Sequence, residues 1–199
     1  ILRDRADKAF LKKVNDDVLQ YCAKLSSYDH GDARRAVDLL RVAGELSDGK
    51  KITKADVDKA QEQLQKDRAS TIVSSASYHL RVVIGAICAN TLLTGNSWNA
   101  TSAIYAKYSK MMVEGTKPLS YRRVVDLLVE LENTGLVISR TLSRGRYGYG
   151  TEYKLKLSPE MVGPVIGKEW WENQIKIKEN EDKMKELDKS LKELSSGRG

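Results

Sequence analysis

The sequence predicts a mainly α-helical protein of two domains, in which the second domain ends in a β-hairpin. Apolar residues recur at helical spacing over most of the 199 residues. The exception follows the amphipathic segment 120–133, where residues 136–140 and 151–157 are strand-like and a glycine-rich tip separates them. Three helices followed by a hairpin is the element order of a winged-helix DNA-binding domain.

The first domain is expected over residues 1–66 as a compact bundle of short helices. Asp32 can cap one of these helices, and the turn at residues 47–50 ends it. Thr53 and Asp56 have the spacing of a capping box at the start of the next helix. An apolar stripe is expected to face the core of the bundle: Val14, Val18, Leu19, Cys22 and Leu25.

Residues 67–76 are small, polar and poorly periodic, and we therefore assign them to a linker between the domains. The winged-helix domain is expected over residues 77–167. Its helices are expected at about 78–93, 99–115 and 120–133.

The chain ends in a charged segment, residues 168–199, which is expected to form a helix with a frayed tail. Four apolar residues recur in it with 3-4-3 spacing: Met184, Leu187, Leu191 and Leu194. This spacing is typical of a coiled-coil seam, although it covers only about two heptads. We expect the stripe to pack against the rest of the chain, and a coiled coil is the alternative.

The charge of the chain suits a polyanionic partner. The net charge is +7, which alone says little because many soluble proteins are mildly basic. Its placement says more: residues 135–157 hold five basic residues and one acid, Glu152, which leaves a net charge of +4 on the expected hairpin.

Cys22 and Cys88 each lie in an apolar helical pattern and are expected to be buried thiols. His30 and His79 do not complete a metal-binding spacing, so no metal site is predicted, and His79 is expected to be structural. No apolar run approaches the roughly 20 residues of a membrane span, and no signal peptide is evident. We therefore expect a cytoplasmic protein, which would be associated with the nucleoid if it binds DNA. The opening at Ile1, without an initiator Met, suggests a fragment of a longer protein.

The segment 120–133 has the pattern of a recognition helix. Its apolar stripe (Val124, Leu127, Leu128 and Leu131) is expected to be buried, which places Arg122 nearly opposite and Arg123 on the flank. Ser120 can cap the helix, and the first turn is the end that recognition helices point at bases. The alternative is an ordinary surface ion pair between Arg122 and Asp126.

The tip of the hairpin favours nucleic-acid contact. Gly145, Gly148 and Gly150 permit left-handed backbone, and a purely structural turn would not need three glycines interleaved with arginines and tyrosines. An arginine finger suits the narrow minor groove. The candidate DNA contacts are Ser120, Tyr121, Arg122, Arg123, Arg140, Arg144, Gly145, Arg146 and Tyr147.

The chain is not expected to be an enzyme by itself. No Ser-His-Asp, Cys-His or metal-carboxylate arrangement is evident, and the sequence holds no G-x-x-x-x-G-K-[S/T] phosphate loop. Trp98, Trp170 and Trp171 are expected to anchor the core or a hinge rather than to form a ligand site.

Two segments resemble one family. Residues 30–45 (HGDARRAVDLLRVAGE) closely resemble the sensor-2 region in the helical lid of AAA+ replication initiators. Residues 118–132 (PLSYRRVVDLLVELE) and 143–148 (SRGRYG) resemble the C-terminal winged helix of the same family, and residues 1–10 resemble the start of the lid. These are the archaeal origin-recognition and cell-division-control initiators, and the resemblance extends to about residue 167.

The resemblance implies a nucleotide-sensing role for one arginine. Arg34 matches the sensor-2 arginine, which in the family reaches the γ-phosphate of ATP bound by the preceding domain, and Asp32 would cap its helix. The nucleotide-binding core is absent from this sequence. No cofactor is therefore expected here, whereas ATP or ADP with Mg is expected in an intact parent protein.

The resemblance also implies partners. Double-stranded origin DNA is the expected ligand of the winged helix, with the recognition helix in the major groove and the basic wing in or beside the minor groove. Other initiator subunits and the replicative helicase are further expected partners. The alternative function is a winged helix used mainly for protein–protein contact.

Overall fold

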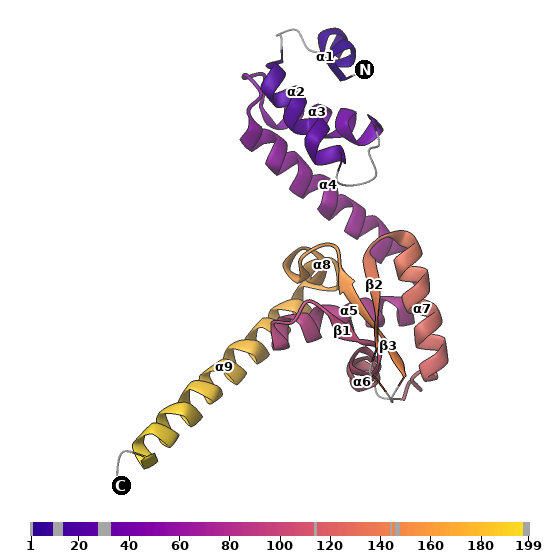
Figure 1. Ribbon diagram of the computed structural model, residues 1–199, viewed down its shortest axis with the longest axis vertical. Coiled ribbons are helices and arrows are strands. Elements are labelled where there is room, and N and C mark those ends of the chain that lie inside the picture. The colour runs from indigo at the N-terminus through magenta and orange to yellow at the C-terminus, as the bar shows by residue number, and fades with distance from the viewer. Residues whose placement is uncertain are drawn as a thin grey trace. The chain divides into compact units, whose positions relative to one another are not determined.

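The computed structural model describes residues 2–9, 14–27, 33–113, 115–143, 145 and 148–196. The chain divides into two compact units, Ile1–Arg68 and Ala69–Gly199, and each unit has its own hydrophobic core. Figure 1 labels the elements along the chain.

The first unit is a bundle of helices: α1 (Leu2–Ala9), α2 (Asp16–Ser27), α3 (Ala33–Leu46) and the first half of α4 (Lys54–Ser75). The predicted stripe of α2 is confirmed, because Val18, Leu19 and Cys22 are buried with Leu39 and Leu40 of α3. The predicted turn after α3 is present as well. The proposed cap Asp32 lies outside the described residues.

The predicted capping box at the start of α4 is confirmed. Oδ2 of Asp56 accepts hydrogen bonds from the backbone N–H and the hydroxyl group of Thr53, at 2.9 and 2.7 Å. The Thr53 hydroxyl oxygen in turn accepts from the N–H of Asp56, at 3.3 Å. The hydrogen bond from the Thr53 side chain is the main cause that lowers the pKa of Asp56. These bonds satisfy backbone N–H groups that a helix start leaves free.

Residues 67–76, which the sequence assigned to a linker, continue α4 as far as Ser75. Ala69 and Val73 lie four residues apart and are both buried in the core of the second unit, with Ile72 packed against it. Small polar residues separate Ala69 from Ile72 and Val73 in the sequence, so their helical spacing was not recognised. The helix itself therefore joins the two units.

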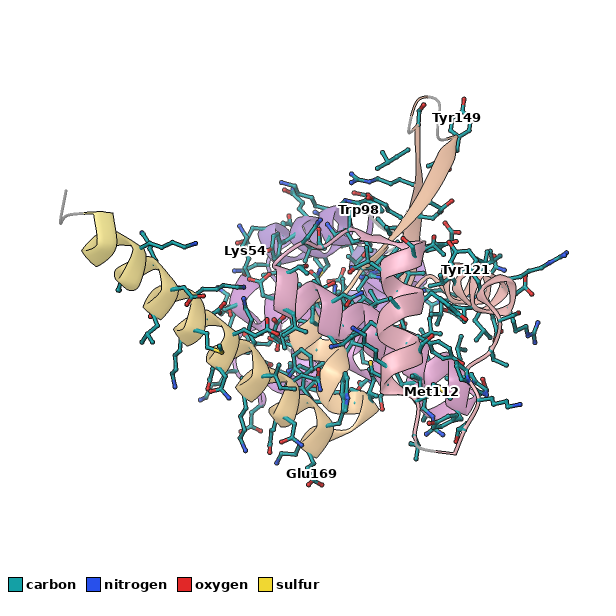
Figure 2. The ribbon with its side chains drawn as sticks, turned by 90° about the horizontal axis from the view of Figure 1, so that it is seen from below. Lys54, Trp98, Met112, Tyr121, Tyr149 and Glu169 are labelled. Atoms are coloured by element: carbon teal, nitrogen blue, oxygen red, sulfur yellow. The ribbon has the colours of Figure 1, made fainter. Side chains whose placement is uncertain are left out.

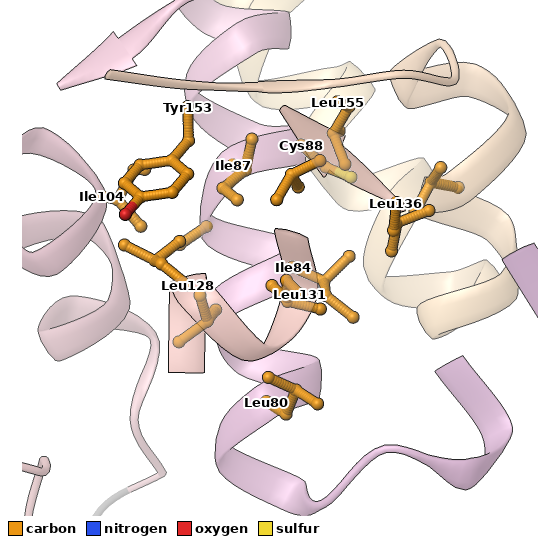
Figure 3. Packing of buried hydrophobic residues seen from close by; sticks show 14 of the residues in the cluster. Leu80, Ile84, Ile87, Cys88, Ile104, Leu128, Leu131, Leu136, Tyr153 and Leu155 are labelled. Atoms are coloured by element: carbon orange, nitrogen blue, oxygen red, sulfur yellow. The ribbon is translucent and has the colours of Figure 1, made fainter. Parts of the chain in front are cut away.

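The second unit is built around α5 (Tyr78–Thr94), which is buried along most of its length. Ser77 caps its start, and Gly95, with φ of 70°, ends it in the left-handed conformation. Side chains of α6 (Thr101–Met111), α7 (Tyr121–Thr134) and the sheet pack around it. Figure 3 shows Ile84, Ile87 and Cys88 of α5 among buried side chains of α6, α7 and β3.

The sheet of the second unit has three antiparallel strands in the order β1-β3-β2. The predicted hairpin is confirmed as β2 (Val137–Ser143) and β3 (Tyr149–Leu155). The expectation of a helix from near Asn99 was wrong at its start, because Asn99–Ala100 forms strand β1 and pairs with Tyr153 and Glu152 of β3. A two-residue strand is too short to produce a periodic pattern in the sequence.

Two further helices complete the second unit. α8 (Pro159–Ile166) packs on α5, and α9 (Lys168–Ser196) packs on α8 and α5 through its first turns. Trp171 is 4% exposed and lies in the core, and Trp170 packs against it, so both tryptophans are core anchors as predicted. The C-terminal half of α9 extends away from this domain (Figure 1).

Candidate nucleic-acid interface

Helix α7 begins at a capped and exposed end. The hydroxyl oxygen of Ser120 accepts a hydrogen bond from the N–H of Arg123 at 3.4 Å, which confirms the predicted cap. The predicted buried face is confirmed too, because Val124, Leu127, Leu128 and Leu131 are all in the core. The core therefore holds the helix from one side and leaves its first turn facing solvent.

Arg122 and Arg123 are both exposed in that first turn. The sequence left open an ion pair between Arg122 and Asp126, but the partner of Asp126 is Arg123, with Nη1 and Oδ2 3.6 Å apart. Asp126 therefore pairs with its i,i+3 neighbour Arg123 and not with its i,i+4 neighbour Arg122. Both side chains of this pair are more than half exposed, so the pair holds Arg123 only weakly.

The hairpin of β2 and β3, with its tip, forms the wing. Figure 2 shows it rising from the helices, with Tyr149 at its outer end, where this side chain is 80% exposed. Gly145 and Gly148 have φ of 59° and 81°, and the N–H of Gly148 donates to the carbonyl oxygen of Gly145. Gly150, by contrast, sits in the ladder opposite Leu142, so its predicted turn role was wrong. Arg144, Arg146 and Tyr147 lie outside the described residues.

Arg140 is held on the wing by two neighbours. It lies opposite Glu152 across the β2–β3 ladder, and its Nε and Nη2 donate to Oε2 of Glu152 at 2.9 and 2.7 Å. Its guanidinium group also stacks over the ring of Trp98, 4.2 Å from the ring centroid. The charge of Arg140 is thus largely balanced by Glu152. Arg140 therefore attracts a polyanion less strongly than an unpaired arginine would.

The start of α7 is tied to the core through Tyr108. The hydroxyl oxygen of this fully buried residue accepts from the N–H of Leu119 at 3.0 Å, just before Ser120. Nδ1 of His79 lies 2.8 Å from the same oxygen, so His79 is a structural histidine as predicted. Tyr121 makes an edge contact with Tyr105, whose ring stacks on that of Tyr108. The aromatic rings therefore connect the core to the first residue of α7.

The first unit contains one residue that was predicted to have a function, the nucleotide-sensing arginine Arg34. The Arg34 side chain is exposed in the first turn of α3.

Across the described parts of the chain, no group of three or more His, Cys, Asp and Glu side chains is placed to hold a metal ion. Within those same parts, no helix has the length and apolar character needed to span a membrane.

Two family models match consecutive parts of the chain. The Cdc6 AAA+ ATPase-type lid domain matches residues 1–62, and the CDC6 C-terminal winged helix domain matches residues 71–163. The chain belongs to the Cdc6 family of replication initiators. The matches agree with the division of the structure into a helical unit and a unit with a β-hairpin.

Known members of the Cdc6 family are similar over most of this chain. An ORC1-type DNA replication protein 1 from Sulfurisphaera tokodaii is 37% identical over 85% of the chain, and an ORC1-type DNA replication protein from Thermococcus kodakarensis is 40% identical over 81%. The chain spans 44% and 40% of the length of these two relatives. A structure of the Aeropyrum pernix ORC1 protein in complex with DNA is 34% identical, with a TM-score of 0.75. The match covers 88% of this chain and 47% of the Aeropyrum pernix chain.

Sequence reasoning missed three contributors to this surface in the Cdc6-family chain. Trp98 was expected only as an anchor, and Glu152 only as one acid in a basic hairpin; both hold Arg140. Tyr108 was not singled out from the sequence, although its hydroxyl group holds the entry to α7. A buried tyrosine normally finds a hydrogen-bond partner, which was the available signal.

Proposed function

We propose that this Cdc6-family chain binds double-stranded DNA through its second unit. The start of α7 enters the major groove, and the wing lies in or beside the minor groove. The observation that carries the proposal is the capped first turn of α7, where Arg122 and Arg123 face solvent while the opposite side of the helix is fixed in the core. This is the end that recognition helices point at base edges.

The residues divide by role in this proposal. Arg122 and Arg123 contact bases, because an arginine can bond guanine through two donors. Ser120, Tyr121 and the free N–H groups of the first turn contact phosphate. On the wing, Gly145 allows a close backbone approach, and the DNA contacts are made by Arg144, Arg146 and Tyr147. Arg140 has a different part, since it braces the wing through Glu152 and presents only its 44% exposed edge to DNA.

The DNA complex of the Aeropyrum pernix ORC1 protein supports DNA as the ligand, since that protein is 34% identical to this chain, and we propose that the DNA is double-stranded. The names of the two relatives support a place in DNA replication, and we propose replication origins as the binding sites. Other initiator subunits and the helicase are further proposed partners. We place this activity in the cytoplasm, at the nucleoid.

Nucleotide control is proposed only for a longer protein. We propose that Arg34, which lies in the first turn of α3 and within the segment matched by the lid model, is a sensor-2 arginine. The sequence holds no phosphate loop, so the residues present would contribute one arginine to a site that another domain completes. In such a protein ATP or ADP with Mg is the proposed cofactor, and we propose no catalysis by this chain.

The test is fluorescence anisotropy of the chain on a labelled origin duplex and on a scrambled duplex, at two salt concentrations. We expect binding that weakens with salt, with a slope in log K of about −0.9 per phosphate contacted. Arg122→Ala and Arg123→Ala should reduce the preference for the origin duplex, and Arg144→Ala with Arg146→Ala should weaken binding to both duplexes. Arg41→Ala, at an exposed arginine of the first unit, is the matched control.

Each outcome decides between the readings. Affinity that does not change with salt would overturn the proposal. Binding without preference would move sequence recognition to a domain beyond this chain. Absence of binding to either duplex would favour the alternative, a winged helix that contacts protein partners.

A further inference from the structure

Helix α9 has two different faces. Trp171, Gln174 and Ile175 lie on the face that packs against the domain, and Lys178 continues it by donating to the carbonyl oxygen of Leu93 at 3.3 Å. At 100° per residue, Met184 and Leu187 lie on the opposite face, about 140° and 160° from Trp171, and Ile177 lies at the edge of that face, about 120° from Trp171.

The opposite face of α9 is apolar and exposed. The side chains of Ile177, Met184 and Leu187 are 43%, 68% and 67% exposed, and Figure 2 shows this part of the helix extending away from the domain. The expectation that the stripe packs against the rest of the chain was therefore wrong for Met184 and Leu187. The domain already occupies the other face of α9, so a partner that covers Met184 and Leu187 would come from outside the chain.

We propose that α9 forms a short parallel coiled coil with α9 of a second copy of this chain. Ile177 and Met184 occupy successive a positions of a heptad repeat, Leu187 is at d, and the sequence continues the repeat with Leu191 at a and Leu194 at d. Asn180 occupies the first d position, where a polar residue lowers stability. With about two and a half heptads, the association is weak and reversible.

The charges beside the stripe select the second copy and its orientation. Lys176 and Lys183 occupy g positions, and Glu181 and Asp188 occupy the e positions five residues later. In a parallel pair each lysine faces the acid of the other chain, whereas in an antiparallel pair lysine faces lysine and acid faces acid. Like charges at these positions oppose association, so the pattern favours parallel helices.

Three other charged residues of α9 lie away from these positions. Asp182 pairs with Lys178 at 2.9 Å and with Lys185 at 3.8 Å, and all three occupy b or f positions on the outer side. Glu181 also faces Lys107 of α6, where its charge partly offsets the lowering of the Lys107 pKa by burial. Lys183 with Asp188 is therefore the cleaner pair to test.

Sedimentation velocity on the full chain at increasing concentration tests the association. We expect a monomer–dimer equilibrium that the combined change Met184→Glu and Leu187→Glu abolishes, with unchanged helix content by circular dichroism. Lys189→Glu is the matched control, since it alters the net charge by the same two units on the outer face and should leave the dimer intact. A chain that stays monomeric at every concentration, or a dimer that survives both glutamates, would overturn the proposal.

Two further variants test the orientation. Lys183→Glu alone and Asp188→Lys alone should each weaken the dimer several-fold, and mixing the two variants should restore it, because each then supplies the charge that the other needs. Met184→Cys should form a disulfide between the two copies under oxidation, since equivalent a positions face each other only in a parallel pair. A dimer that fails to cross-link and ignores the charge changes would be antiparallel or built elsewhere.

Discussion

The hydroxyl oxygen of Tyr108 lies 3.0 Å from the backbone nitrogen of Leu119 and accepts its hydrogen bond. Tyr108 is fully buried in α6, whereas Leu119 stands at the entry to α7. This bond fixes the point at which the chain turns into the proposed recognition helix. Since Nδ1 of His79 is 2.8 Å from the same oxygen, the phenol group satisfies both neighbours, accepting from Leu119 and sharing a second hydrogen bond with His79.

Tyr108→Phe is expected to destabilise the second unit by about 1–3 kcal/mol, because it leaves partly buried polar groups at Leu119 and His79 without their partner. Urea unfolding followed by tryptophan fluorescence measures this, since Trp98, Trp170 and Trp171 all lie in that unit. Tyr105→Phe is the control, because the described contacts of Tyr105 are made by its ring. Equal urea midpoints for the two variants would show that the bond contributes nothing.

The pair of Arg140 and Glu152 is expected to be coupled. A double-mutant cycle with Arg140→Met and Glu152→Gln should give a coupling free energy of about 0.5–1 kcal/mol, at the upper end for a partly exposed pair, because two donors converge on one carboxylate and Trp98 covers the guanidinium. The cycle for Arg123 and Asp126, which are 3.6 Å apart and more exposed, should give less. A larger coupling for the second pair would contradict the geometry.

Gly163 is expected to tolerate no side chain. A Cβ at this position would overlap the six-membered ring of Trp171, which is buried against α8. Gly163→Ala should cost about 1–3 kcal/mol of stability in thermal or urea unfolding, as overpacking of a core does. Gly167→Ala is the matched control: its φ is 175° and its Cβ would meet only the Cβ of Trp170 at 3.6 Å. Equal stabilities of the two variants would refute the steric argument.

The thiols of Cys22 and Cys88 are expected to resist alkylation by iodoacetamide at pH 8 until the chain unfolds. Burial raises the pKa of Cys22 to about 11 and that of Cys88 further still, and the thiolate is the reactive form. An unfolded cysteine titrates near pH 8.5, so the folded chain holds this proton more tightly. The stabilisation from Cys22 is therefore complete below about pH 8.5 and is lost as the pH rises towards 11.

Two measurements check this expectation. Labelling of the native chain at the rate of the unfolded chain would contradict the burial of both thiols. Cys22→Ala should make the stability of the first unit less dependent on alkaline pH, while the same change at Cys88 should act on the second unit.

Much of the fold was predictable because it depends on residues near in sequence. Helix starts at Ser120 and Thr53 are made by side chains that bond within the first turn, and Gly95 ends α5 because it adopts the left-handed conformation. The buried face of α7 follows from helical periodicity alone. The hairpin follows from alternating residues around glycines, two of which have positive φ.

The sequence by itself thus determined most of the helices, the hairpin and the position of the arginines at the start of α7, since all of these are local. Only the tertiary structure decided that Arg140 is held by Glu152 and Trp98, that Tyr108 anchors Leu119, and that Met184 and Leu187 of α9 face solvent. The physical reason is that a side chain's periodicity shows which face of its own element it occupies. Which charge, ring or hydrogen-bonding group meets that face depends on how distant segments pack, and no local pattern encodes it.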